Sequence, residues 1–123
     1  MWIMLAPLAA FFIIACSGQR YLQVSAEVLY KSLRNVSADV ERGAWISAEK
    51  EFLVVHQKWM KTRDLWDLIV DHWEIDSIEV SMVRLEQYIR NKNAEDSAAE
   101  CATLEESLTH IPEKETFSIK SLL

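Results

Sequence analysis

Residues 22–45 read LQVSAEVLYKSLRNVSADVERGAW, and their apolar residues recur at alternating intervals of four and three. Such spacing places them on one face of an α-helix. Gly43 follows the last of them, and glycine commonly ends helices because it adopts a left-handed backbone conformation without strain. The stretch therefore predicts one amphipathic helix that ends just before Gly43, with its apolar face formed by Leu22, Ala26, Leu29, Leu33, Val36 and Val40.

The rest of the chain shows three further apolar patterns of helical spacing. The second and third patterns differ in register, so a straight helix cannot keep both on one face, and a break near residues 70–72 resolves the conflict. The fourth is followed by Pro112, which is expected to end it. The apolar positions are Trp45, Ala48, Phe52, Val55, Trp59, Trp66 and Ile69, then Ile75, Ile78, Met82, Leu85 and Ile89, and then Ala94, Ala98, Cys101, Leu104, Leu108 and Ile111.

The connections between these helices are short, so neighbouring helices should run antiparallel. The sequence therefore predicts an all-α fold, in which a small antiparallel bundle of about four helices, built as stacked helical hairpins, follows an N-terminal membrane helix. Residues 1–19 form a hydrophobic anchor or signal segment, residues 20–112 form the bundle domain, and residues 113–123 form a short C-terminal tail.

The first sixteen residues, MWIMLAPLAAFFIIAC, are apolar apart from Pro7, and no charged residue occurs before Arg20. A helix over residues 1–19 is about 28 Å long, which is close to the hydrocarbon thickness of a bilayer and favours a single-pass membrane anchor. The run from Ile13 to Cys16 also has the form of a bacterial lipobox, in which Cys16 is lipidated after cleavage. A cleaved signal, a lipoprotein and a buried helix of a soluble protein are therefore alternatives to the anchor.

The composition excludes several classes of function. The chain has 19 acidic and 13 basic residues and a net charge of −6, so it should repel nucleic acid. Its two glycines and two cysteines supply neither a phosphate-binding loop nor a disulfide framework. We expect no nucleic-acid partner, no cofactor and no enzyme activity.

Residues 69–76, IVDHWEID, collect one histidine and three carboxylates at the break between the second and third helices. With Asp71 as the N-cap, Glu74 occupies the third helical position, so the two would form a capping box in which each side chain binds a backbone N–H. Val70 and Ile75 then occupy the positions of a hydrophobic staple. This interpretation predicts a helix that begins at residue 72.

The same segment also allows a metal or acid–base site. His72, Asp76 and Glu79 follow one another at intervals of four and three on one helical face, and His110 or Glu113 would complete the set. Nitrogen and oxygen ligands at this spacing can hold a divalent ion such as zinc. Because no HExxH motif accompanies them, the metal-dependent enzyme is the weaker hypothesis.

Four tryptophans, Trp45, Trp59, Trp66 and Trp73, fall at multiples of seven and nearly align on a helix. They can form a core seam, in which each ring buries on the order of 200 Å². Alternatively, Trp45, Trp59 and Trp66 can form an exposed surface that docks a partner helix or the membrane. We favour the core, because a small bundle needs the burial.

Three stretches resemble a known family: GAWISAEKEFLVVHQKW (43–59), LWDLIVDHWEIDSIEVSMVRLEQYIRNKN (65–93) and LTHIPEKETFSIKSLL (108–123). Together they are similar to the bacterial family called domain of unknown function 4363, with the motifs DHxEID and HIPEKE as its more specific parts. The resemblance implies a short protein with an N-terminal hydrophobic segment and a helical remainder. It implies no activity, cofactor or catalytic residue.

Two arguments predict opposite sides of the membrane for the bundle. The nearest basic residues, Arg20, Lys31 and Arg34, follow the apolar segment, which by the positive-inside rule would leave the bundle in the cytoplasm. The resemblance implies the opposite, because family members carry lysines before the membrane segment, although this sequence has Met1 and Trp2 there. We expect a bundle outside the cytoplasm, at the cell membrane.

The resemblance also implies a partner, since family genes often neighbour one for a multi-pass membrane protein. The leading hypothesis is a membrane-tethered helical interaction module or accessory subunit of a bacterial envelope protein. A lipoprotein anchored at Cys16 with a structural or binding role is one alternative. A metal-dependent enzyme that uses His72, Asp76 and Glu79 is the other.

Overall fold

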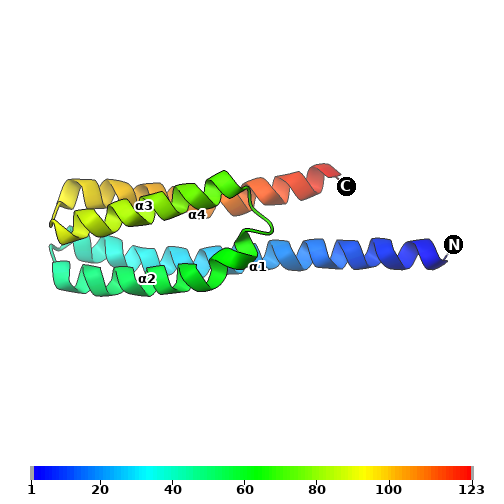
Figure 1. The fold of residues 1–123 in the computed structure, drawn as a ribbon, viewed down its shortest axis with the longest axis horizontal. Helices are drawn as coiled ribbons and strands as arrows, with labels where there is room; N and C mark the ends of the chain where they lie inside the picture. The colour runs from blue at the N-terminus through cyan, green and yellow to red at the C-terminus, as the bar shows by residue number, and fades with distance from the viewer. Residues whose placement is uncertain (1, 123) are drawn as a thin grey trace.

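A computed structural model describes residues 2–122, which form four helices and the turns that join them (Figure 1). The helices are α1 (Trp2–Glu41), α2 (Trp45–Trp66), α3 (His72–Arg90) and α4 (Ala94–Leu122). The all-α fold expected from the sequence is confirmed. The break between the second and third helices is also found where the register changes.

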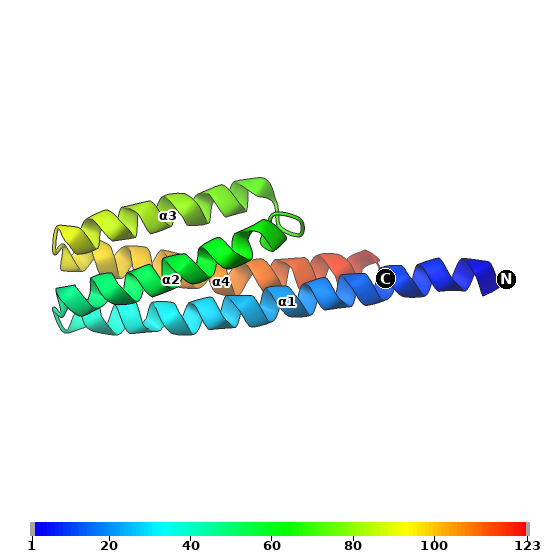
Figure 2. The same ribbon diagram turned by 60° about the horizontal axis from the view of Figure 1, so that its bottom comes forward.

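The helices form a bundle in which α1 packs against α2 and α4, and α3 packs against the same two. Consecutive helices run antiparallel, so the turns at residues 42–44 and 91–93 lie at one end, which we call the tip (Figure 2). The opposite end, the base, holds the turn at residues 67–71 and the C-terminal half of α4. Beyond the base α1 projects alone toward the N-terminus.

The core is built from the apolar stripes that the sequence predicts. The six α1 positions and the five α3 positions are all buried, and so are Ala48, Phe52, Val55, Trp59 and Trp66 of α2. Two other parts of the predicted stripes differ. Trp45 and Ile69 are only partly buried, and at the start of α4 Ala94 and Ala98 are exposed while Ser97 is buried instead. The stripe on α4 is therefore Ser97, Cys101, Leu104, Leu108 and Ile111.

Gly43 ends the first helix, as expected. Its φ is +70°, a left-handed conformation that favours glycine. The N–H of Gly43 donates to the carbonyl of Val40, and the N–H of Ala44 donates to the carbonyl of Asp39. This pair of bonds satisfies carbonyls that the end of α1 would otherwise leave free, and it turns the chain into α2.

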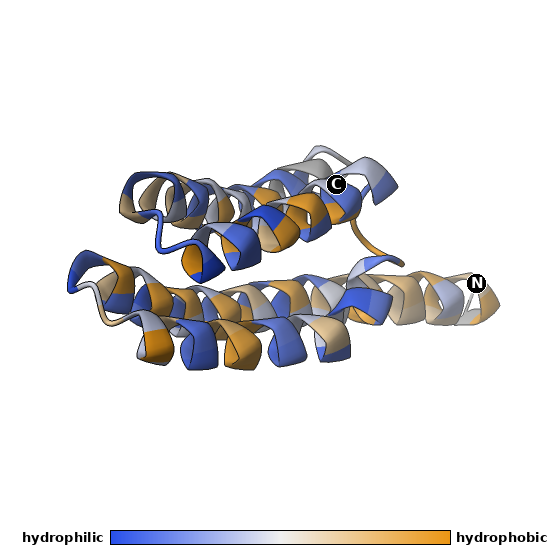
Figure 3. Ribbon diagram, turned by 60° about the vertical axis from the view of Figure 1, so that its left-hand side comes forward, coloured by the Kyte–Doolittle hydropathy of each residue, from blue (hydrophilic) through white to orange (hydrophobic). Residues whose placement is uncertain are grey.

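α1 is one helix of 40 residues, so it is about 60 Å long. The boundary that the sequence predicts at residue 19, between the hydrophobic segment and the bundle domain, is not a break in this helix. It is the point at which α1 passes from an exposed segment into the bundle. Side chains from Ile3 to Ile14 are exposed, and the first buried residue is Leu22. Figure 3 shows apolar colouring along the projecting part, whereas apolar and polar residues alternate in the bundle. By length and composition, α1 could cross a membrane.

The expected stop at Pro112 is wrong, because α4 continues through this residue to Leu122. The proline is buried, and its carbonyl accepts hydrogen bonds from Gln19 Nε2 of α1 at 3.1 Å and from Thr116 Oγ1 at 2.9 Å. Gln19 Nε2 also donates to Thr116 Oγ1. The two bonds from Gln19 hold this part of α4 against α1, next to the residue where the proline removes an N–H. Residues 113–122 are therefore helix rather than an irregular tail.

Candidate functional site at the base of the bundle

Two contacts hold the turn between α2 and α3 against α1. Trp66 Nε1 donates a hydrogen bond of 2.8 Å to Ser25 Oγ inside the core. Further along the turn, Ile69 packs closely on Gly18, where an added Cβ would lie 3.6 Å from Ile69 Cδ1. The turn therefore lies beside Gly18, at the point where the projecting part of α1 enters the bundle.

Asp71 is the N-cap residue of α3, as the sequence predicts, but its side chain makes no capping hydrogen bond. Instead Lys114 Nζ of α4 lies 3.7 Å from Asp71 Oδ2 and 3.1 Å from Glu74 Oε1. Glu74 is only 6% exposed. The expected capping box is therefore wrong, because both carboxylates join α3 to α4 through one lysine. The staple positions Val70 and Ile75 are both buried, as that interpretation required.

The charges in this cluster influence one another. The pKa of Lys114 is raised, first by its hydrogen bond to Glu74 and then by the nearby carboxylates Asp71 and Glu115. The pKa of Glu115 is also raised, first by burial and then by Asp71 and Glu74. Lys114 Nζ lies 5.5 Å from the ring centroid of Trp73, within reach of a cation–π interaction. One ammonium group thus pairs with two carboxylates at the base, Asp71 and Glu74, and balances only part of the negative charge of the cluster.

His72 is paired with carboxylates rather than assembled into a metal site. Its Nδ1 lies 3.2 Å from Asp67 Oδ1, and its Nε2 lies 3.6 Å from Asp76 Oδ2. Glu79 instead forms an ion pair with Arg63 of α2 at 2.7 Å. Within residues 2–122, no three histidine, cysteine or acidic side chains are grouped so that they could hold a metal ion. The structure thus brings His72 and Asp76 together, whereas Glu79 is paired with Arg63.

The two residues suggested as further metal ligands lie elsewhere. His110 lines a shallow cavity of about 220 Å³ between α3 and α4, together with Trp73 and Glu74. Glu113 lines a different groove, between α1 and α4. His72 lines neither of these cavities, and its ion-pair partners are Asp67 and Asp76.

We expect the pKa of His72 to lie above the ordinary value of a histidine. The hydrogen bond to Asp67 is the main cause, and the charges of Asp76, Asp67 and Glu79 add to it. Because the folded-state pKa is raised, this pairing stabilises the protein below the unfolded-state pKa and ceases as pH rises through the folded-state value. An NMR titration of the ring protons measures the shift, and Asp67→Asn should reduce it. An unchanged pKa in Asp67→Asn would contradict the pairing.

The tryptophans are divided between the core and the surface. Trp59 and Trp66 are 1% and 0% exposed, and their rings meet edge to face with centroids 5.4 Å apart. The core seam is therefore confirmed for these two, and the docking surface of three tryptophans is wrong. Trp45 is half-buried and packs against the core near the tip, whereas Trp73 is 64% exposed at the base.

The two cysteines differ in environment. Cys16 is exposed on the projecting part of α1, which leaves it accessible for the lipidation suggested by the sequence. Cys101 is buried in the core, and this burial raises the pKa of its thiol to about 12. Cys101 is therefore a poor nucleophile, because the reactive form is the thiolate.

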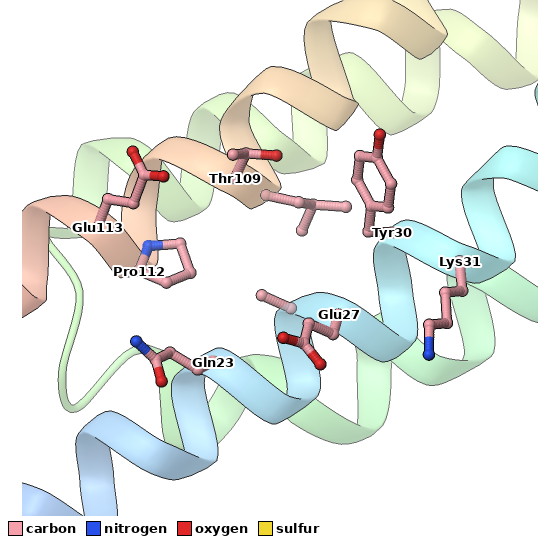
Figure 4. Close-up of a pocket in the computed structure, with 9 residues that line it drawn as sticks. Gln23, Glu27, Tyr30, Lys31, Thr109, Pro112 and Glu113 are labelled. Atoms are coloured by element: carbon pink, nitrogen blue, oxygen red, sulfur yellow. The ribbon is translucent and has the colours of Figure 1, made fainter.

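A groove of about 360 Å³ runs between α1 and α4 (Figure 4). Figure 4 shows Gln23 and Glu27 on α1 facing Pro112 and Glu113 on α4. The polar part of the lining consists of two carboxylates, one lysine, one tyrosine, one glutamine and one threonine, and it contains no histidine or cysteine. The lining residues are Gln23, Ala26, Glu27, Tyr30, Lys31, Leu108, Thr109, Pro112 and Glu113.

Lys114 and Arg63 are two cations of other helices that pair with Glu74 and Glu79 of α3, and the sequence pattern predicts neither pair. The HIPEKE motif contains Lys114, but a helix that ends at Pro112 places this residue in the short C-terminal tail, away from the helical faces that the pattern pairs. Arg63 lies on the polar side of the α2 stripe. It is paired with Glu79 only because the break at residues 67–71 folds α3 back along α2.

The comparisons with known proteins agree with the resemblance noted in the sequence. The model of the family DUF4363, a domain of unknown function, matches residues 16–122 and so covers the whole bundle. Searches of curated proteins and of solved structures each gave no match. Because the matched region is most of the chain, the protein belongs to the DUF4363 family.

Proposed function

We propose that this protein is a membrane-tethered helical module that binds another membrane protein of a bacterial envelope and serves as its accessory subunit. The observation that carries the proposal is the projecting part of α1. Its side chains from Ile3 to Ile14 are exposed and almost all apolar, and no other part of the described chain covers them. An exposed apolar helix of this kind is stable in a bilayer but not in water.

The bundle itself offers a surface for a partner. On the outer side of α2, Ile46, Leu53 and Met60 are exposed and spaced by seven residues, so they lie along one line of the helix. A helix of another protein can pack on such a line in the manner of a coiled coil. Along the α2–α3 side, Val80 and Val83 are exposed as well.

Site-specific photo-crosslinking tests the proposal in cells. A benzophenone amino acid at Leu53 should crosslink one membrane protein, which copurifies with the chain in mild detergent. The same amino acid at Ala102, which is exposed on α4, is the control and should not capture that protein. Recovery of the chain alone from both positions would contradict the proposal.

A lipid anchor at Cys16 is the second candidate for the tether, because this thiol is exposed. Mass spectrometry of the mature protein separates the two tethers. We expect the mass of the full-length chain. The mass of a chain that begins at Cys16 and carries acyl groups would show that the tether is a lipid anchor and not a membrane helix. The proposed interaction with a partner would not be affected by that result.

We place the bundle outside the cytoplasm in this proposal, following the orientation implied by the family. A membrane-impermeant maleimide tests it in intact cells on Asn91→Cys, which is exposed in the turn between α3 and α4 at the tip, in a Cys16→Ser background. Labelling only after the cells are opened would place the bundle inside.

We assign no enzyme activity to this protein in the proposal. Elemental analysis of the purified protein tests this. Stoichiometric metal that is lost in the His72→Ala and Asp76→Ala double variant would contradict it.

A further inference from the structure

The level of the membrane surface along α1 follows from its exposed and charged residues. The hydrocarbon core of a bilayer needs about 20 helical residues. The apolar residues from Trp2 to Cys16 are followed by Ser17, Gly18 and Gln19, and the first charge is Arg20. If α1 spans the bilayer, as the proposed function requires, the hydrocarbon boundary must lie near Gly18.

The turn between α2 and α3 lies at this same level. Ile69 is in van der Waals reach of Gly18, so residues 67–71 lie beside the boundary and not farther along the bundle. Figure 2 shows this turn at the end of the bundle nearest the projecting helix. Its exposed apolar residues are Leu68 at 82% and Leu65, and Trp73 follows at the start of α3.

The C-terminal end of α4 goes past this level. Gln19 is hydrogen bonded to Thr116, and α4 runs antiparallel to α1 for six further residues, to Leu122. At 1.5 Å per residue this adds about 9 Å, toward the N-terminal end of α1. The sequence there, FSIKSL (117–122), has three apolar residues, two serines and one lysine, and a lysine side chain at this depth can extend back to the headgroups.

We propose that the base of the bundle is a second membrane-contact surface, formed by the α2–α3 turn, Trp73 and the end of α4, and that its ligand is the headgroup region of the bilayer. Large apolar side chains that are exposed next to a membrane helix are buried when they enter this region. Tryptophan is favoured there because its ring is apolar and its N–H is polar.

The charges at the base indicate which lipid headgroups this surface would contact. Asp67, Asp71 and Asp76 lie in or beside the turn, and the partner cations of this region are Lys114 and His72. Because the carboxylates outnumber the cations, anionic headgroups would not attract this end of the bundle. The contact should therefore form on zwitterionic phosphatidylcholine, by burial of apolar side chains, without a requirement for anionic lipid.

A matched pair of exposed residues allows a direct test on the full chain. Leu68 at the base and Ile46 at the tip are 82% and 78% exposed, so each accepts a cysteine that carries an environment-sensitive fluorophore. Cys16 is replaced by serine, and the buried Cys101 can stay. The chain is placed in phosphatidylcholine vesicles that contain lipids with a nitroxide quencher near the headgroup. We expect quenching at position 68 to be several-fold stronger than at position 46.

A third label at Phe11, in the projecting helix, separates this inference from the proposed tether on which it rests. Quenching at positions 11 and 68 but not at 46 supports the inference. Quenching at position 11, with equal and weak quenching at 68 and 46, overturns the inference and leaves the tether standing. Weak quenching at all three positions overturns both. The label at Ile46 shows whether the fluorophore alone drives insertion.

Discussion

Replacement of Trp66 by alanine is expected to lower the free energy of unfolding by about 3–5 kcal/mol, the typical loss for a buried aromatic side chain. Trp66 is fully buried where α2 meets α1. Its loss removes the edge-to-face contact with Trp59 and the hydrogen bond to Ser25 Oγ. Chemical denaturation of the full chain in detergent micelles, followed by circular dichroism, measures the change.

The control for this experiment is Trp73→Ala in the same micelles. Trp73 is mostly exposed, and its described partner is Lys114, so we expect a change within about 0.5 kcal/mol. Equal destabilisation by the two substitutions would contradict the assignment of Trp66 to the core and of Trp73 to the surface.

Replacement of Pro112 by alanine is expected to act in the opposite direction, with a gain of about 1–2 kcal/mol. Proline inside a helix is about 3 kcal/mol less favourable than alanine, because its N–H is missing and its ring crowds the preceding turn. The gain is reduced because proline restricts the unfolded chain, by about 0.4–1 kcal/mol, and because the buried ring loses some packing. The same denaturation experiment measures it.

The adjacent exposed residue gives the control for this experiment, since Glu113→Ala should change the stability by less than about 0.5 kcal/mol. The outcome also reports on the helix itself. If α4 ended at Pro112, alanine at this position would bring no gain. A neutral or destabilising Pro112→Ala would therefore contradict the continuous helix from Ala94 to Leu122.

The sequence was sufficient for the parts of the fold that depend on local periodicity. The stripe from Leu22 to Val40 is buried along its whole length, and Gly43 adopts the left-handed conformation that the end of the helix requires. Both predictions depend on properties of a single helix and its end. They need no knowledge of which helices are neighbours, and short turns then fix the antiparallel order.

The sequence was not sufficient where a contact between distant residues decides the outcome. Pro112 has a low helix propensity, but Gln19 of α1 donates a hydrogen bond to its carbonyl, a contact across 93 residues that no local pattern reveals. Asp71 and Glu74 fit a capping box by spacing. They pair instead with Lys114, because the continued α4 brings this lysine beside the start of α3.

The same limit applies to the candidate site. Spacing alone put His72, Asp76 and Glu79 on one face of a helix, yet Glu79 pairs with Arg63 across the α2–α3 contact. The periodicity of the tryptophans likewise did not show that Trp73 lies beyond the break and points to solvent while Trp66 is buried. Both outcomes depend on the position of the turn at residues 67–71, which sets how α3 packs against α2.

The unbroken α1 has a mechanical consequence. α1 is continuous from its projecting part into the bundle. If the projecting part spans a membrane, as proposed above, the bundle must follow any change in the inclination of that part. From residue 19 to the end of α1 is about 33 Å, so a change in tilt of about 20° would sweep the tip sideways by about 11 Å. α1 would thus act as a stiff lever, which converts reorientation within the lipid into displacement of the far end of the bundle.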